Sequence, residues 1–598
     1  MNYSQLCGDA EAYFKPAFKY YKKSTKIVTS PDSFLEPLLL ARCYIDERNI
    51  SKAELYLKQA SEYLSLYAYD QVFYQSFIYF NKAKLSILKN DYQEGIVFLR
   101  KGSKIISSED TNLSHTLNKD VVAKYINDYI DIYQNLKSLD FDMNKLMDYF
   151  ELEGLKNRIS ADGRLEEMKL IASTNIRASL KDDLSKIEIE VKISKDKLDQ
   201  DTNEKNLKIH QEKIKEQYKL YARYLENEPN IKALMNPSHE NYVEMAMDID
   251  DMSVILSYNL ASDGGTIIAQ TNSGKFIYKI NESSKDIQNN INKLRSSIKN
   301  VDPNFSYDAS YYLYQTLIEP LNEIIKNKSN IYLYGSELED LQFGVLIENF
   351  DEINDISSER QKLRTASWLI KKYSFARIFP LSNNVLNKKE YDHDFLGFAD
   401  PDSFEELGLS ELPGAIQEIR DIGITSSSNF SLDFALTKSD ASKSNLIARL
   451  SESYERLVFA THSVPPNWNG ITSEGALVLS DEKGDYLLTA TEIVNLDVRS
   501  DIVVLSSCST EEKGSDSIYK SFLVAGANSV MYTNWKQETI SAARITDSFF
   551  KFIAIDKYSK QKALQEASKV IMEEQKFAHP AYWGNFSIAY RNLENPVT

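Results

Sequence analysis

The chain has 598 residues, a formal net charge of −17 and three cysteines, and these properties exclude several classes of protein. A chain of this length exceeds what one hydrophobic core usually supports, so we expect about two to four domains. Its acidic balance lacks the basic surface that nucleic-acid binding needs, so we expect no direct nucleic-acid partner. We find no apolar run of membrane-spanning length and no signal-peptide pattern at the N-terminus, so we expect a soluble cytoplasmic protein without a membrane partner.

Cysteine and histidine are sparse along the chain. Cys7, Cys43 and Cys508 are too few and too scattered to predict a disulfide framework or a cysteine-rich metal site. The six histidines contain no pair at helical ligand spacing, and no glycine-rich stretch has the pattern of a phosphate-binding P-loop. We therefore expect neither a metal nor a cofactor.

Residues 1–150 have the pattern of stacked amphipathic helices, with apolar side chains at three- and four-residue intervals. Residues 41–60 and 83–102 look alike, since each predicts a helix, a short polar turn and a second helix with a small residue, Ala53 or Gly95, near its start. The turns are expected at 47–49 and 89–91. A third copy from about Ala123 is weaker.

These repeats resemble divergent tetratricopeptide repeats, although their offset of 42 residues exceeds the usual period of about 34. Stacked helix pairs of that kind usually present a concave surface to a partner peptide or protein. A helical scaffold without a ligand of its own is the alternative. Residues 151–238 form a connector, where charged residues interleaved with Ile and Leu predict a long helical hairpin or a coiled-coil-like arm.

From about residue 240 short apolar runs alternate with helical stretches, which predicts an α/β fold with a mostly parallel sheet covered on both faces. In such sheets functional residues lie beyond the carboxyl ends of the strands. Two predicted strands end on His462 and Cys508. The expected strands are residues 253–261, 265–272, 275–280, 330–336, 456–462, 501–508 and 529–535.

His462 and Cys508 could face each other if their strands are parallel neighbours, because the ends of such strands lie about 5 Å apart. The residues between them predict a loop, a hairpin and a short helix. A thiolate beside an imidazolium is an activated nucleophile, and the same histidine can protonate the leaving amine. The pair therefore favours a cysteine–histidine dyad. The alternative is a buried core cysteine and a histidine that merely closes a strand.

Residues from about 240 to the C-terminus resemble a CHAT domain, the caspase-related peptidase module that often follows tetratricopeptide repeats in prokaryotic proteins. The resemblance implies a caspase-like fold with a supporting half at 239–430 and a catalytic half at 431–598. It also implies His462 as general base and acid, Cys508 as nucleophile, and cleavage of peptide bonds through a thioester without a metal. The motifs that carry it, in the family's order, are "YDASYYLYQTLIEPLNEII", "NIYLYGSELEDLQFGVL", "FLGFADP", "LPGAIQEIR", "VFATHS", "DIVVLSSCST", "SFLVAGANSVMYTNW" and "HPAYWGNFSIAY".

The chain departs from the family's pattern beside both residues of the dyad. The family usually has glycine after its histidine, where this chain has Ser463. The backbone amides of Ser463 and Cys508 would form the oxyanion hole, and a positive φ at Ser463 would strain the loop. The stretch after Cys508 is short and acidic, whereas the family commonly has a longer glycine-rich one.

Five residues are expected to border the substrate cleft. Ser506 shares a strand face with Cys508 and would line the pocket for the residue before the cleaved bond. Asn534 and Trp535 follow a neighbouring strand, although Trp535 could equally cap the core. Glu511 and Glu512 would favour basic substrates, and a solvated acidic loop is the alternative for them.

These features lead to one function and one alternative. The leading hypothesis is a regulated caspase-like cysteine endopeptidase that cleaves a protein substrate. An activating protein or complex would bind its tetratricopeptide-like repeats, in a setting of prokaryotic antiviral defence or cell death. The alternative is a scaffold for protein interactions whose peptidase domain is catalytically silent.

Overall fold

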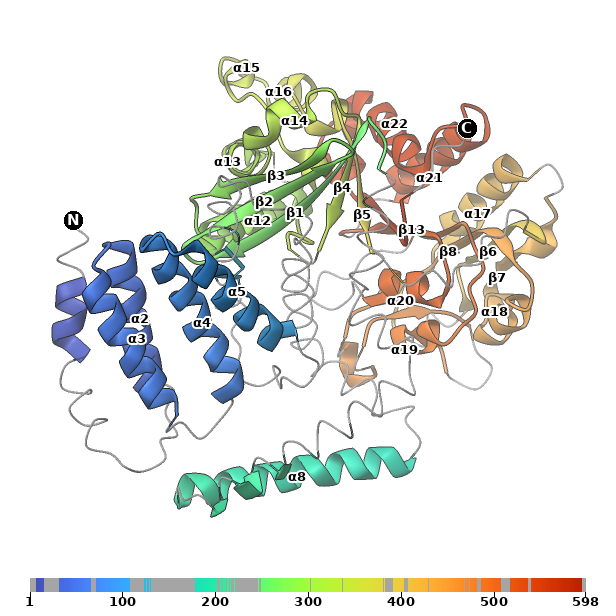
Figure 1. Ribbon diagram of the computed structural model, residues 1–598. Helices are drawn as coiled ribbons and strands as arrows, with labels where there is room; N and C mark the ends of the chain where they lie inside the picture. Colours follow the sequence, from blue (N-terminus) through green and yellow to red (C-terminus); the bar gives the residue numbers. More distant parts are fainter. Residues whose placement is uncertain are drawn as a thin grey trace. The chain divides into compact units, whose positions relative to one another are not determined.

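The computed structural model divides into two compact units, which Figure 1 colours along the chain. The first unit comprises Met1–Asp162 with Ser173–Pro229, and the second comprises Gly163–Ala172 with Asn230–Thr598. The structure describes residues 7–14, 32–65, 71–107, 178–201 and 249–593, with single helical residues within 123–130 and 205–246. Within 249–593 it leaves out 302, 336, 380, 382–390, 403–406, 428–429, 467, 473, 481–484, 507–516 and 536–538.

The first unit contains two helix pairs, as the sequence pattern predicts. The first turn lies at 47–49 and the second at 89–91, and Arg48 and Asn90 both have a positive φ in them. Asn49 and Asp91 then cap the second helix of each pair through their side chains. The predicted third copy from Ala123 lies mostly outside the described residues. The four helices are α2 (Asp32–Asp46), α3 (Ile50–Leu64), α4 (Gln71–Leu88) and α5 (Tyr92–Ser107).

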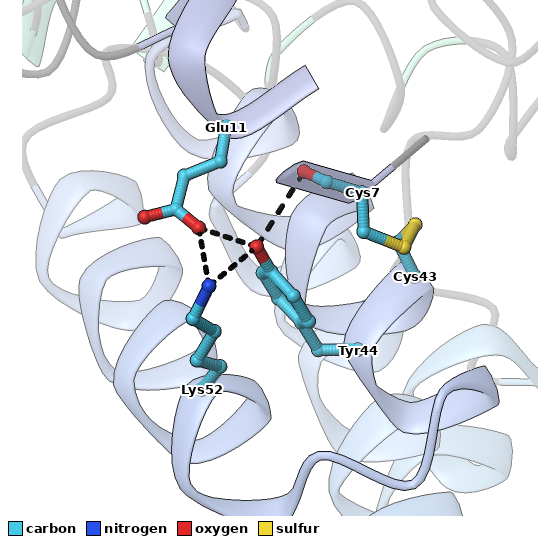
Figure 2. Close-up of a disulfide and its surroundings, with 5 residues drawn as sticks. All are labelled: Cys7, Glu11, Cys43, Tyr44 and Lys52. Carbon is cyan, nitrogen blue, oxygen red and sulfur yellow. Dashed lines mark hydrogen bonds and ion pairs between the residues drawn. A yellow bond between two sulfur atoms is a disulfide. The ribbon is translucent and has the colours of Figure 1, made fainter. Parts of the chain in front are cut away.

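Cys7 and Cys43 form a disulfide, which the sequence pattern did not predict. Their Cα atoms lie 5.9 Å apart although 36 residues separate them in the sequence. The helix at residues 7–14 lies against α2, and this long-range proximity is not visible in the spacing of the cysteines. Figure 2 shows the disulfide beside a polar cluster in which Tyr44 and Lys52 both donate to the Glu11 carboxylate.

The connector contains one long described helix, α8 (Ala178–Gln200). Ser194 Oγ lies 2.9 Å from Nδ1 of His210, and Lys213 lies 2.8 Å from the Glu190 carboxylate. These contacts join residues on α8 to helical residues that follow it in the chain. They favour the hairpin over a single extended arm.

The second unit is built on a mixed sheet whose described strands run in the order β3-β2-β1-β4-β5-β14-β13-β12-β8-β6-β7. Most neighbouring pairs are parallel. The predicted fold class, helical repeats followed by an α/β part, is confirmed. The strands are β1 (Ser253–Ala261), β2 (Gly264–Thr271), β3 (Gly274–Ile280), β4 (Asn330–Tyr334), β5 (Ser374–Ile378), β6 (His393–Ala399), β7 (Ala435–Thr437), β8 (Tyr454–Ala460), β12 (Ile502–Leu505), β13 (Ser529–Thr533) and β14 (Phe586–Tyr590).

Five strands, β7-β6-β8-β12-β13, form a wholly parallel block. Counted along the chain, their spatial order is 2-1-3-4-5, which is that of a doubly wound sheet with its switch point between β6 and β8. Strand β6 is absent from the predicted strands, and the predicted boundary at residue 430 separates it from its partner β8. The pairing of β6 with β8 along its length places β6 in the same block.

Helices cover both faces of this block (Figure 1). The pair α17 and α21 packs on one face and the pair α19 and α20 on the other. None of the helices that the structure describes is both long and apolar enough to cross a membrane. The described helices of this unit include α12 (Ser284–Lys299), α13 (Tyr307–Leu317), α14 (Asn322–Ile325), α15 (Asp351–Asn354), α16 (Glu359–Thr365), α17 (Pro413–Ser426), α18 (Lys443–Arg449), α19 (Ala490–Val494), α20 (Ser517–Ala525), α21 (Thr539–Ala554), α22 (Lys560–Glu573) and α23 (Pro580–Trp583).

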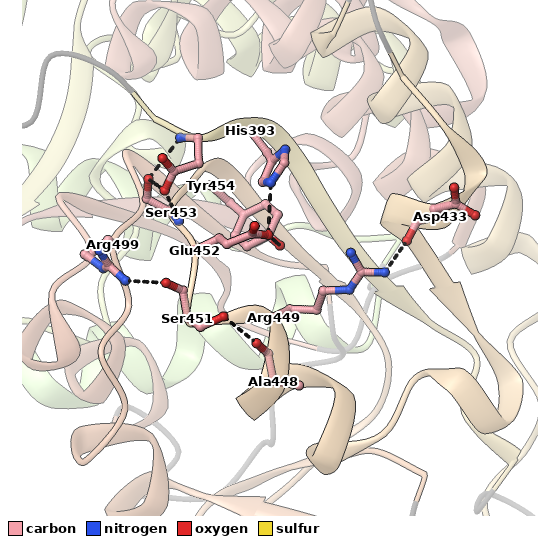
Figure 3. Close-up of polar contacts among 10 residues, drawn as sticks. His393, Asp433, Ala448, Arg449, Ser451, Glu452, Ser453, Tyr454 and Arg499 are labelled. Carbon is pink, nitrogen blue, oxygen red and sulfur yellow. Dashed lines mark hydrogen bonds and ion pairs between the residues drawn. The ribbon is translucent and has the colours of Figure 1, made fainter.

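The amino ends of β6 and β8 are tied together by an aromatic and polar cluster (Figure 3). The ring of His393 stacks on that of Tyr454, its partner in the strand register, with centroids 5.2 Å apart. Its Nε2 also lies 3.0 Å from the Glu452 carboxylate. These contacts fix the register of the two strands at the edge opposite to the one where function is expected.

Candidate active site

His462 lies two residues beyond the end of β8, at the carboxyl edge of the parallel block. Its half-buried imidazole places Nε2 2.8 Å from the backbone carbonyl oxygen of Ser410. A carbonyl oxygen can only accept, so Nε2 must carry the proton and donate it. In the neutral ring Nδ1 is then the nitrogen that can accept a proton.

The backbone around His462 is held by a small second sheet. The amide of Val478 donates to the His462 carbonyl at 2.9 Å, and the Thr461 hydroxyl donates to the Val478 carbonyl at 2.5 Å. The predicted hairpin and the short helix α19 after it are both present. The strands are β9 (Ser463–Val464), β10 (Ala476–Val478) and β11 (Leu487–Thr489).

The loop that carries Ser410 is anchored by apolar and polar contacts. Leu409 and Leu412, on either side of Ser410, pack against the core of the small sheet, which comprises Val464, Ala476, Val478 and Leu487. The amide of Leu412 also donates to the Asp400 carboxylate at 2.7 Å. The acceptor for the histidine is therefore on a fixed part of the chain.

Asp400 and Lys438 are parts of this support that the sequence analysis missed. Asp400 directly follows β6, is 1% exposed and has a positive φ of 46°. Lys438 Nζ lies 2.8 Å from its second carboxylate oxygen, and this contact raises the pKa of Lys438. An aspartate at the end of the apolar run in "FLGFADP" is the signal that could have identified it.

Strands β8 and β12 are parallel neighbours, as the dyad hypothesis requires, with Leu505 opposite Phe459. They end at Ala460 and Leu505, earlier than the predicted ends at 462 and 508. The ladder stops there because the chain from Thr461 onward bonds to β10 instead. Ser506 directly follows β12, and its amide donates to the Phe459 carbonyl at 2.9 Å. Cys508, Glu511 and Glu512 lie outside the described residues.

A buried carboxyl group lies on α17. Glu418 is 7% exposed and accepts a hydrogen bond from the Thr546 hydroxyl of α21 at 3.0 Å. Burial raises the pKa of Glu418 to about 7, although the nearby hydroxyl groups of Ser506 and Thr546 oppose the shift. The role of Ser506 in a substrate pocket stays a prediction.

The other expected cleft residues follow β13 at the same edge. Of the two interpretations of Trp535, the core one fits, because its side chain is 2% exposed and its Nε1 donates to the Ala581 carbonyl at 3.0 Å. Its side chain therefore does not line an open cleft. Asn534 is half-buried, and its side-chain amide donates to the Ser587 hydroxyl at 3.0 Å.

Ser463 does not carry the strain that a positive φ would cause. It is not among the described non-glycine residues with positive φ, and it pairs with Leu477 between β9 and β10. The backbone carbonyl of the preceding residue, His462, accepts a hydrogen bond from the amide of Val478. Because antiparallel hydrogen bonds alternate along a strand, the amide of Ser463 points away from β10.

Comparison with solved structures finds two distant likenesses. One is the separase–securin complex of Saccharomyces cerevisiae, at 9% identity and a TM-score of 0.35, over 93% of this chain and 53% of that chain. The other is the complex of RgpB pro- and mature domains from Porphyromonas gingivalis, at 10% identity and a TM-score of 0.30, over 51% of this chain and 75% of that chain.

Comparison with known sequences finds a relative of part of the chain and a family match. Tetratricopeptide repeat protein 28 of Homo sapiens is 27% identical over 109 residues, which cover 17% of this chain and only 4% of that protein. The sequence model of the CHAT domain family matches residues 308–592. This match confirms the resemblance found in the sequence motifs, over a shorter span than expected. Residues 308–592 are therefore similar to the CHAT domain family.

Proposed function

We propose that the chain is a caspase-like cysteine endopeptidase in which His462 and Cys508 form the catalytic dyad. The register of β8 and β12 carries this proposal. The two strands pair with a constant offset of 46 residues, from Ile502 opposite Arg456 to Leu505 opposite Phe459. Cys508 follows His462 by the same 46 residues. Parallel neighbours lie about 4.8 Å apart, and three further residues in that register would bring the thiol level with the imidazole.

The Ser410 carbonyl supports the proposed role of the histidine. Because Nε2 of His462 donates a hydrogen bond to the Ser410 carbonyl oxygen, Nδ1 can take the thiol proton of Cys508. The thiolate attacks the substrate carbonyl carbon, and the imidazolium then returns the proton to the leaving amine. A thioester remains, and water, deprotonated by the same imidazole, hydrolyses it to the free acid and restores the thiol.

Backbone amides would stabilise the negative charge that develops on the substrate oxygen. The amide of Ser463 points away from the β9–β10 ladder, and it is proposed as the first donor. The amide of Cys508 would supply the second donor. Ser506, Asn534, Glu511 and Glu512 are proposed to border the cleft.

The CHAT domain supports a peptidase, and the helix pairs of the first unit support regulation through a partner. We propose that an activating protein or complex binds helices α2–α5, because stacked helix pairs serve as protein-binding surfaces. A cytoplasmic setting in prokaryotic antiviral defence or cell death follows from the family resemblance and is part of the same proposal.

The test of this function compares wild type with Cys508→Ala, each incubated with candidate substrate proteins encoded near this chain. We expect cleavage fragments with wild type and none with the variant, because removal of the thiol abolishes the acyl-enzyme. His462→Ala should behave like Cys508→Ala. Identical fragment patterns from wild type and Cys508→Ala would contradict the peptidase, and the silent scaffold would replace it.

A further inference from the structure

Cys7, Cys43 and Glu47 form a cluster of three possible metal ligands in the first unit. Cys43 and Glu47 stand four residues apart at the end of α2, a spacing that places two side chains on one face of a helix. The Glu47 amide continues the helical pattern by donating to the Cys43 carbonyl at 3.0 Å. Cys7 belongs to the helix at residues 7–14. The two sulfur atoms and one carboxylate oxygen of Glu47 all lie within 4.8 Å of one another.

The disulfide leaves the carboxylate of Glu47 without a hydrogen-bond donor. Glu47 Oε1 is buried and accepts no hydrogen bond from the residues that the structure describes. Disulfide sulfur atoms have no proton to donate, and a buried acceptor without a donor destabilises the fold. A cation held between the sulfur atoms and the carboxylate would give this oxygen a partner.

We propose that Cys7, Cys43 and Glu47 bind one zinc ion once the disulfide is reduced. This site goes beyond the proposed function and does not depend on the peptidase. Two thiols of a reductant deliver two electrons and two protons to the Cys7–Cys43 bond, and they leave joined as a disulfide of their own. Zinc then displaces the two cysteine protons and binds both thiolates.

The ligands of this cluster suit zinc. In tetrahedral sites thiolate sulfur binds Zn²⁺ at about 2.3 Å and carboxylate oxygen at about 2.0 to 2.2 Å, so ligand atoms lie roughly 3.5 to 3.8 Å apart. The freed sulfur atoms have to separate by only about 1.7 Å to reach that spacing. With three protein ligands, water takes the fourth position. Thiolates disfavour Mg²⁺ and Ca²⁺, which prefer oxygen ligands.

The zinc site gives the first unit a second way to hold its N-terminal helix. Reducing compartments keep cysteine pairs as thiols, so the proposed cytoplasmic setting favours the zinc-bound form. Both the disulfide and the zinc ion tie the helix at residues 7–14 to α2, which belongs to the proposed partner-binding surface. Reduction without zinc releases this tie. Reduction with zinc keeps it.

The test measures zinc in the full chain. The protein is reduced with a phosphine, freed of the phosphine by gel filtration, incubated with zinc acetate and passed through gel filtration again. Elemental mass spectrometry should find about one zinc ion per reduced wild-type chain, and less than about a tenth of that in chain kept oxidised. Cobalt(II) in place of zinc should give the sulfur-to-metal charge-transfer absorption of thiolate ligands.

Substitutions identify the ligands through competition with a chromogenic chelator. Cys7→Ser and Cys43→Ser should each weaken zinc binding at least about 100-fold, because each removes a thiolate. Glu47→Gln should weaken it about tenfold or more. Glu54→Gln is the matched control, since Glu54 is a half-exposed glutamate of the same unit that forms an ion pair on α3. It should keep the wild-type affinity.

Three results would overturn the zinc site. They are equal zinc contents in reduced and oxidised wild type, wild-type affinity in both Cys43→Ser and Glu47→Gln, or loss of the zinc in Cys508→Ser, which would assign it to the third cysteine. Circular dichroism checks that each variant is folded. Glu47→Gln can still form the disulfide, so it tests the site even where a cysteine variant unfolds.

Discussion

Two buried or half-buried glutamates, one in each unit, have opposite electrostatic surroundings. In the first unit Glu11 accepts hydrogen bonds from Lys52 and Tyr44, which outweigh its desolvation and lower its pKa to about 2. In the second unit Glu418 is more deeply buried and has only hydroxyl partners, so burial raises its pKa to about 7. Glu11 is therefore charged throughout the physiological range, whereas Glu418 changes its state near neutral pH.

The two glutamates also differ in what holds their surroundings together. The Glu11 cluster lies beside the Cys7–Cys43 disulfide, so a covalent bond restrains the helices that carry it (Figure 2). Glu418 accepts a hydrogen bond from Thr546, which joins α17 to α21 without a covalent bond. The same residue type is thus ion-paired and charged in one place, and buried with a raised pKa in the other.

The largest expected effect concerns the covalent restraint. Cys43→Ser should lower the stability of the first unit by roughly 4 kcal/mol, because the disulfide closes a loop of 36 residues in the unfolded chain. Hydrogen exchange of peptides from α2 and α3 at increasing urea concentration measures this loss of stability. Addition of a reductant to wild type should reproduce the loss. Unchanged protection in both experiments would show that the disulfide does not restrain this unit.

A smaller effect is expected for Glu418→Gln, and it depends on pH. The folded-state pKa of Glu418 is raised, so the unfolded state releases its proton first and wild type loses stability as pH rises from about 4.5 to about 7. Gln does not titrate. Between about pH 4.5 and pH 7 the free energy of unfolding of the variant should therefore rise by about 3 kcal/mol relative to that of wild type. Urea unfolding of the second unit at pH 4.5 and pH 8 measures the difference, and a difference that does not change with pH would refute the raised pKa of Glu418.

The smallest effect is expected for Glu11→Gln, with the opposite sign. The folded-state pKa of Glu11 is lowered, so its stabilisation is present above about pH 4.5 and is lost as pH falls toward 2. Lys52 is partly exposed and solvent screens its ion pair with Glu11. We therefore expect the free energy of unfolding of wild type to exceed that of the variant by only about 1 kcal/mol at pH 7. The same exchange measurement at pH 7 and pH 3 tests it. A stability advantage of wild type that grows toward low pH would contradict the lowered pKa of Glu11.

The sequence predicts features that depend on neighbouring residues better than features that depend on distant ones. The turns at 47–49 and 89–91 were predictable because left-handed and capping residues occupy adjacent positions. The existence of β8 and β12 was predictable from their apolar runs. Their ends were not, because the chain leaves the sheet at Thr461 to bond to Val478, a partner 17 residues away.

The candidate site shows the same limit. His462 was identifiable from its place after an apolar run, yet its acceptor Ser410 lies 52 residues earlier in the chain. The sequence left Trp535 equally open to a cleft or a core position, and its burial and its hydrogen bond to Ala581 place it in the core. Glu418 lies inside the motif "LPGAIQEIR", but only the packing of α17 against α21 shows that it contacts Thr546, 128 residues away in the chain.

The central claim is that His462 and Cys508 lie close together beyond the ends of the adjacent strands β8 and β12, and a His462→Cys variant tests this geometry directly. Parallel neighbours at the same level meet the Cα separation that a disulfide requires, about 4.4 to 6.8 Å. Under mild oxidation we therefore expect peptide mass spectrometry to find positions 462 and 508 cross-linked. Ser463→Cys, whose side chain points to the opposite face of the strand, should not cross-link. Two free thiols in the His462→Cys variant, or equal cross-linking in both variants, would contradict the dyad.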